Sequence, residues 1–244
     1  MKQLFTYISP DKKFNAEHQM AVKIQIDNSL RLGWKREDIL LVTNFYYEHN
    51  GVKSIVIGDE NYCDYFFFTT KIYVIVELFN LGMIEENEMY WYHDFDCFQL
   101  NEITEGELEL ERHDMGLSNY GRRERLCSAS MFFKKGAEDI FRSLKEDTDR
   151  TKVNEEICIM RLINRNKDTL GKRVKLLNTT YAFQKWNIKT CYPTTNKPIK
   201  AVHFHLTPDK YDFFVLGNNK LNLVIIPEEL IKIFNKYGFN KNEE

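Results

Sequence analysis

The chain has 244 residues, of which 43% are hydrophobic, and this length fits one large domain with a substantial core. Its formal net charge of −2 excludes the strongly basic footprint of a general nucleic-acid binder, so we expect no nucleic-acid partner. The five cysteines are scattered without a CxxC pair, which argues against a disulfide framework or a zinc cluster and favours reduced thiols in a cytoplasmic protein.

The first sixty residues alternate between strands and a helix. Residues 2–9 read as a strand, and apolar positions at roughly helical spacing predict a helix over 15–33. Continuous apolar runs at 38–45 and 52–59 are typical of strands that are covered on both faces. This alternation indicates an α/β fold with a largely parallel sheet.

Residues 69–81 carry two conflicting signals. Their many β-branched side chains favour a strand, whereas their length and the following Gly82 favour a buried helix, which is our prediction. The longest apolar stretch of the chain, 65–84, includes this segment. Because it contains Lys71 and Glu77, it is too polar for a transmembrane span, and we expect a soluble protein without one.

The remaining elements alternate less regularly. A strand is expected at 88–96, and residues 111–125 read as a loop. Acidic residues in the first turn support a helix at 154–166, because the helix dipole favours them there. The other expected elements are a strand at 126–136, a helix at 137–145, strands at 174–183 and 200–206, and a short strand followed by a helix over 221–238.

The strand at 88–96 ends with two carboxylates, Asp94 and Asp96, one residue apart. Strand residues two apart point to the same side, and two unpaired carboxylates in one buried place would repel each other. A divalent cation resolves this conflict, and oxygen ligands suit Mg²⁺ or Mn²⁺, which often bind substrate phosphates. Ligands of open α/β sheets lie beyond the carboxyl ends of the strands, where this pair falls. The alternative is a solvated turn, with His93 as a core or supporting histidine.

A second candidate feature is the strand at 200–206, where His203 and His205 alternate with apolar residues. Alternating histidines are unusual in a hydrophobic strand unless that face lines a polar site. Imidazole is a common metal ligand and proton carrier. The alternative is one hydrogen-bonded core histidine and one exposed histidine. Lys210 follows closely and is a candidate phosphate contact, or else an ordinary surface lysine.

The order of these features resembles the GT-A fold of nucleotide-sugar glycosyltransferases, of the glycogenin and lipopolysaccharide galactosyltransferase type, over residues 2–210. The resemblance implies a Rossmann-type mixed, mostly parallel sheet flanked by helices. We expect this domain to span residues 1–215, with 216–244 as a C-terminal strand-helix elaboration of it. In that family an Asp-x-Asp pair, here Asp94 and Asp96, binds Mn²⁺ or Mg²⁺, which holds the diphosphate of the donor. A late-strand histidine, which would be His203 or His205, completes the metal shell in several members.

The resemblance also implies where the donor nucleotide would bind. In the family a basic residue at the start of the helix before the Asp-x-Asp strand faces the nucleotide, and Lys71 matches it. Asp94 would also touch the ribose or sugar. The end of the first strand usually cradles the nucleobase, which assigns that role to Thr6, Tyr7, Ile8 and Ser9. The alternatives are a packed core tyrosine at position 7 and a snorkelling helix-end lysine at position 71.

Further positions follow from the resemblance on the acceptor side. The stretch "LCSASMFF" looks like the family's small-residue strand beside the acceptor, and "VNEEI" looks like the acidic pair beside the donor sugar, here Glu155 or Glu156. Helix-capping acids are the alternative. An inverting reaction needs a carboxylate base at the acceptor hydroxyl, for which Glu155, Glu156 and Asp114 are candidates, whereas a retaining reaction does not need it there.

The function implied is transfer of a sugar from a nucleoside diphosphate sugar, UDP-sugar foremost, to a hydroxyl of a glycan or other acceptor. One alternative is a metal-dependent nucleotidyltransferase, although "SPDKKFN" lacks the glycine-rich phosphate loop of such enzymes. The other is a non-catalytic sugar-binding module with aromatic platforms.

Overall fold

A computed structural model describes residues 1–119, 126–165, 169–184, 191–204 and 226–239 of the chain. Its strands are β1 (Lys2–Tyr7), β2 (Ile39–Thr43), β3 (Glu48–His49), β4 (Val52–Val56), β5 (Tyr90–His93), β6 (Cys97–Gln99), β7 (Met115–Asn119), β8 (Leu126–Phe133), β9 (Val174–Leu177), β10 (Phe183–Gln184) and β11 (Ala201–His203). Its α-helices are α1 (Ala16–Arg31), α2 (Thr70–Asn80), α3 (Glu105–Leu108), α4 (Glu138–Thr151), α5 (Glu155–Arg165) and α8 (Glu228–Tyr237).

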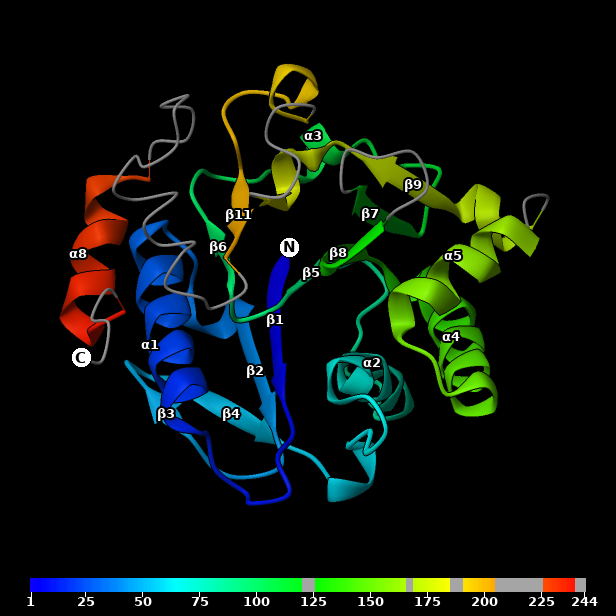
Figure 1. Ribbon diagram of the computed structural model, residues 1–244, viewed down its shortest axis with the longest axis horizontal. Helices are drawn as coiled ribbons and strands as arrows, with labels where there is room; N and C mark the ends of the chain where they lie inside the picture. The colour runs from blue at the N-terminus through cyan, green and yellow to red at the C-terminus, as the bar shows by residue number, and fades with distance from the viewer. Residues whose placement is uncertain (120–125, 166–168, 185–190, 205–225, 240–244) are drawn as a thin grey trace.

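The described strands form two sheets. The larger has the order β3-β4-β2-β1-β5-β8-β7-β9, and the smaller has the order β10-β11-β6 (Figure 1). In the larger sheet β4, β2, β1 and β5 run parallel, and β8 then lies antiparallel to β5. Because Leu4 and Phe5 on β1 are both fully buried, this strand is covered on both faces, as continuous apolar strands require. The expected α/β fold with a mixed, mostly parallel sheet is confirmed.

Helices cover the larger sheet on two sides (Figure 1). On one side α1 lies beside α8, and on the other α2, α4 and α5 lie together. The predicted helix at 69–81 is confirmed as α2, in which nine of the eleven side chains are buried. Packing on several sides explains its β-branched composition, because tertiary burial overrides a weak helix propensity. None of the helices in the described part of the chain combines the length and the apolar character that a membrane crossing requires.

Two expectations for the second half were wrong. Residues 111–125 are not entirely a loop, since Met115–Asn119 form β7 between β8 and β9. Glycine is uncommon inside strands, but it fits here because a Cβ at Gly116 would lie 2.9 Å from a Leu177 side-chain atom. The strand expected over 174–183 ends at Leu177, and β10 then joins the other sheet.

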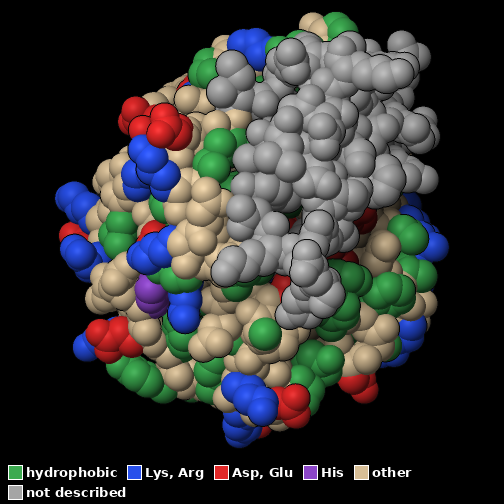
Figure 2. All heavy atoms as spheres, turned by 60° about the vertical axis from the view of Figure 1, so that its left-hand side comes forward, with side chains coloured by type: hydrophobic (Ala, Val, Ile, Leu, Met, Phe, Trp, Pro, Cys, Tyr) green, Lys and Arg blue, Asp and Glu red, His purple; other side chains and the backbone are tan. Residues whose placement is uncertain are grey.

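Other element boundaries moved by less. Helix α4 continues six residues beyond the expected end at 145, because buried Thr148 extends its packed face through a polar stretch. The strand predicted at 221–226 lies outside the described residues except for its last position, whereas the helix after Pro227 is present as α8. On the described part of the face in Figure 2, acidic and basic side chains are interspersed, in keeping with the small net charge.

Candidate active site

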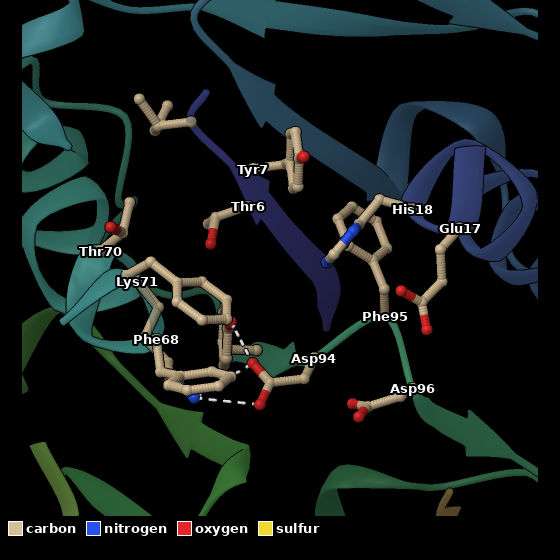
Figure 3. Close-up of a pocket in the computed structure, with 13 residues that line it drawn as sticks. Thr6, Tyr7, Glu17, His18, Phe68, Thr70, Lys71, Asp94, Phe95 and Asp96 are labelled. Atoms are coloured by element: carbon tan, nitrogen blue, oxygen red, sulfur yellow. Dashed lines mark hydrogen bonds and ion pairs between the residues drawn. The ribbon is translucent and has the colours of Figure 1, made fainter. Parts of the chain in front are cut away.

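A cavity of about 260 Å³ lies beyond the carboxyl ends of β1 and β5 (Figure 3). Four segments meet there because parallel strands deliver the residues that follow them to one edge of the sheet. They are the end of β1, the first turn of α1, the start of α2 and the turn after β5. The lining residues are Thr6, Tyr7, Ile8, Glu17, His18, Phe67, Phe68, Thr70, Lys71, Tyr92, Asp94, Phe95 and Asp96.

The two carboxylates of the Asp-x-Asp pair lie in a tight turn. Strand β5 ends at His93, and the backbone N–H of Cys97 donates to the carbonyl of Asp94 at 3.0 Å, which closes the turn. The smaller sheet then fixes the second acid, because the N–H of Phe204 donates to the carbonyl of Asp96 at 2.8 Å. As predicted, both side chains face the cavity (Figure 3).

The same backbone contact brings His203 to the pair. Ligand atoms of Asp94, Asp96 and His203 all lie within 4.8 Å of one another, which is a spacing that a single cation can span. The donors are two carboxylates and one imidazole, and this mixed oxygen and nitrogen set suits Mn²⁺ or Mg²⁺. The residues present therefore fit a divalent metal.

His203 is buried and held by partners on both ring nitrogens. Its Nε2 lies 3.2 Å from an Asp96 oxygen, and its Nδ1 lies 3.0 Å from the side-chain amide of Gln184. Burial alone would lower the pKa of His203, but the charge of Asp96 outweighs it and holds the pKa well above its usual value. Since a metal needs the neutral imidazole, cation binding at this site competes with protonation of His203.

Lys71 is a buried cation at the base of the cavity. Its Nζ lies 3.0 Å from Asp94, 3.3 Å from Glu155 and 3.1 Å from the hydroxyl of Ser128. Burial would lower the pKa of Lys71, yet the charge of Asp94, with Tyr92 and Glu155, holds it well above its usual value. Lys71 therefore stays charged and compensates two carboxylates. Lys71 is also one of the residues that line the cavity.

Glu155 and Glu156 lie at the start of α5, next to this lysine. Both oxygens of Glu155 are engaged: one accepts from the Ser128 hydroxyl at 2.7 Å, and the other accepts from the Thr69 hydroxyl at 2.9 Å. Burial would raise the pKa of Glu155, but the charge of Lys71 and these hydrogen bonds lower it overall. Glu156 is less buried and accepts from the backbone N–H of Ser128 at 3.2 Å.

The structure does not bring all expected residues to the cavity. Ser9 is tied to the residue after β2, because the Asn44 side chain accepts from its N–H at 3.0 Å, and it does not line the cavity. Asp114 lies beside Lys134, at the far end of β8 from the cavity, where Arg173 donates to it at 2.6 Å. His205 and Lys210 lie outside the described residues.

His93 has a core position, which is one of the two roles expected for it. Its ring packs against Phe5 and Trp91, with ring centroids 4.5 and 4.2 Å away, and it is 1% exposed. Burial lowers the pKa of His93 to about 3, so the imidazole is neutral at pH 7. It fixes the end of β5 but does not line the cavity.

Several lining residues were missed in the sequence. Glu17 and His18 come from the first turn of α1, and the exposed rings of Phe67 and Phe68 come from the segment before α2. One signal was available for the first two: Asn15 is a good helix N-cap, and a helix that follows a parallel strand begins at the carboxyl edge of the sheet. No comparable sequence signal marks the phenylalanines.

Comparison with known proteins supports the fold. No family model matches the sequence, and no curated protein matches it either. Among solved structures, the galactosyltransferase LgtC in complex with donor and acceptor sugar analogs is 12% identical, with a TM-score of 0.61 over 97% of this chain and 96% of that one.

Two further structures share the architecture. A glycosyltransferase involved in the glycosylation of the major capsid of PBCV-1 is 11% identical, with a TM-score of 0.52 over 83% of this chain and 93% of that one. The glycosyltransferase GlyE of Streptococcus pneumoniae TIGR4 is 12% identical, with a TM-score of 0.56 over 95% of this chain and 60% of that one. The chain therefore has the fold of GT-A glycosyltransferases.

Proposed function

We propose that this protein is a metal-dependent glycosyltransferase that moves a sugar from a nucleoside diphosphate sugar, specifically a UDP-sugar, to a hydroxyl of a glycan or another acceptor. One observation carries the proposal: Asp94, Asp96 and His203 converge within 4.8 Å at a cavity on the carboxyl edge of a GT-A sheet. The two aspartates lie in the turn after β5, His203 lies on β11 of the smaller sheet, and position 94 is 109 residues from position 203, so the fold itself assembles the group.

The residues of the site have two kinds of role: some carry charge, and others form the wall of the cavity. Asp96 and His203 would hold the cation, with Asp94 beside them. A bound divalent cation would supply Lewis-acid stabilisation of the departing diphosphate. Lys71 keeps Asp94 in place through two contacts, at 3.0 and 3.1 Å, and adds positive charge next to the position of the diphosphate. Thr6, Tyr7 and Ile8 form the adjoining wall, where the nucleoside would bind.

The three candidate bases are not equivalent. Glu155 has both oxygens occupied and is paired with Lys71, so it is a poor proton acceptor. Asp114 is held by Arg173 at the far end of β8. For an inverting reaction Glu156 is therefore the best candidate of the three, because it is partly exposed and lies beside Ser128, which contacts Lys71.

Ligand-dependent thermal unfolding tests this function. A ligand that binds only the folded protein stabilises it, by about 2.7 kcal/mol at a concentration of 100 times Kd. We expect UDP to raise the melting temperature only when Mn²⁺ is present, and the variant Asp96→Asn to lose that effect. The matched control is Asp38→Asn. Asp38 is half-buried and lies just before β2, at the opposite edge of the sheet, so this variant should respond like the parent. Equal stabilisation of the parent by UDP with and without Mn²⁺ would contradict the metal site.

A further inference from the structure

His18 has a hydrogen-bonding state that its neighbour Asn15 fixes. Asn15 is the N-cap of α1, and its side-chain oxygen accepts the backbone N–H of His18 at 2.8 Å. The same oxygen lies 2.8 Å from Nδ1 of the His18 ring. A backbone N–H is always a donor, so the Asn15 atom must be its amide oxygen. That oxygen can only accept, and Nδ1 must therefore carry the proton.

This assignment leaves the other ring nitrogen as an acceptor. A neutral imidazole carries one N–H, so Nε2 of His18 has a free lone pair. Burial lowers the pKa of His18, against the opposing charges of Glu17, Asp96 and Asp94, and the neutral form predominates at pH 7. Within the described part of the chain, no hydrogen-bond donor reaches Nε2.

The ring is also held in place at the cavity wall. Its centroid lies 4.7 Å from that of Tyr7 and 6.3 Å from that of Phe95, which meets it edge to face. The side chain reaches into the cavity from the first turn of α1, across from Lys71 and Asp94 (Figure 3). A fixed acceptor thus stands beside the wall of β1 residues, on the opposite side of the cavity from the buried cation.

We infer that His18 is a specificity-determining residue, whose Nε2 accepts a hydrogen bond from the nucleoside of the donor. The inference rests on the proposed function and deepens it by naming the part of the donor that the cavity recognises, which is the nucleoside. Two groups of a uridine nucleotide offer such a donor: N3–H of the uracil ring and the ribose hydroxyls. Cytosine has a lone pair at N3, which would meet the lone pair of Nε2 and be disfavoured.

The test compares two replacements of His18. His18→Leu keeps an apolar side chain against Tyr7 but removes the acceptor, whereas His18→Gln keeps a carbonyl acceptor. The probes, titrated calorimetrically in the presence of MnCl₂, are UDP, 2′-deoxy-UDP, CDP and inorganic diphosphate. Binding of Mn²⁺ alone is followed by electron paramagnetic resonance. Unchanged melting temperatures without ligand establish that both variants fold.

We expect His18→Leu to weaken UDP binding by about three- to tenfold, the effect of one hydrogen bond, and His18→Gln to weaken it less. Binding of inorganic diphosphate and of Mn²⁺ alone should not change. If His18 recognises uracil, the parent binds UDP more tightly than CDP, and His18→Leu reduces the difference between these two affinities. If His18 recognises the 2′-hydroxyl, His18→Leu weakens the binding of UDP and of CDP equally and leaves the binding of 2′-deoxy-UDP unchanged.

Three results would overturn the assignment. They are unchanged UDP binding in His18→Leu, equal losses for UDP and inorganic diphosphate, and a loss of Mn²⁺ affinity without nucleotide, which would make His18 a metal ligand. Failure of the proposed function gives a different result, because the parent itself would then bind no UDP in the presence of Mn²⁺.

Discussion

Replacing Lys71 with methionine removes a buried charge that two carboxylates share. Methionine has a similar length and keeps the apolar part of the side chain, but it leaves Asp94 and Glu155 without their cation. The Glu155 side chain is only 4% exposed and that of Asp94 is 27% exposed, so most of the cost comes from Glu155. Removing one partner of a buried ion pair costs about 3–5 kcal/mol, and we expect Lys71→Met to lose that much free energy of unfolding at pH 7.

The pH dependence of this loss has a definite sign. In the parent, Lys71 lowers the pKa of Glu155 against the effect of burial. The stabilisation is therefore present above the usual glutamate pKa and is lost as the pH falls through the lowered value. Without Lys71, only the hydrogen bonds of Glu155 oppose burial, so the pKa of Glu155 is higher in the variant than in the parent and the carboxylate takes up a proton at a higher pH. The difference between Lys71→Met and the parent should be larger at pH 8 than at pH 5.

Urea denaturation followed by tryptophan fluorescence measures these free energies. The double variant Lys71→Met/Glu155→Gln removes the unpaired charge and should recover a large part of the loss, whereas Glu155→Gln alone should cost less than Lys71→Met. The matched control is Lys53→Met, because the Lys53 side chain is 66% exposed and its ammonium lies 4.0 Å from Glu48. This variant should change stability by at most about 0.5 kcal/mol. A loss below about 1 kcal/mol for Lys71→Met, or strict additivity in the double variant, would show that Lys71 and Glu155 are not a stabilising buried pair.

Two further predictions concern the scaffold. Gly116→Ala places a Cβ 2.9 Å from Leu177 and 3.2 Å from Leu110, and the overpacking should cost about 1–3 kcal/mol in urea denaturation; an unchanged midpoint would contradict the tight β7 packing. Asp27→Asn weakens the contact of α8 with α1, where Asp27 accepts from Lys236 at 2.7 Å, and should cost about 1–3 kcal/mol at pH 7. Burial would raise the pKa of Asp27, but its hydrogen-bond partners lower it overall. The cost of Asp27→Asn should therefore shrink as the pH falls below the usual carboxyl range. A cost that is constant down to pH 3 would contradict this prediction.

Some parts of the site could be predicted because they follow from local patterns in the sequence. Asp94 and Asp96 follow an apolar strand, which placed them at one edge of the sheet. Because side-chain direction in a strand has period two, the same pattern predicted that both side chains point to the same side. The alternation around His203 likewise placed that imidazole on a polar face. Strand β2 was recognisable because a strand that is covered on both faces is continuously apolar, whereas β4 has the same sequence pattern but is only partly buried.

The parts that could not be predicted depend on distant partners. Arg173 is 59 residues from Asp114 and holds it away from the cavity, and nothing near either residue in the sequence indicates the pair. The role of Glu155 depends on which donors its oxygens meet, and those come from three other segments. Strand β7 also depends on a distant partner, because Gly116 lies against Leu177, 61 residues further along the chain.

The most direct measurement is the identity of the products formed from UDP-sugars. The purified protein is incubated with a panel of UDP-hexoses and MnCl₂, and the nucleotide products are separated by chromatography. We expect release of UDP from at least one donor, and we expect this release to be lost on chelation of the metal and in Asp96→Asn but retained in Asp38→Asn. Formation of UMP and a sugar phosphate, or UDP release that persists in Asp96→Asn, would contradict it.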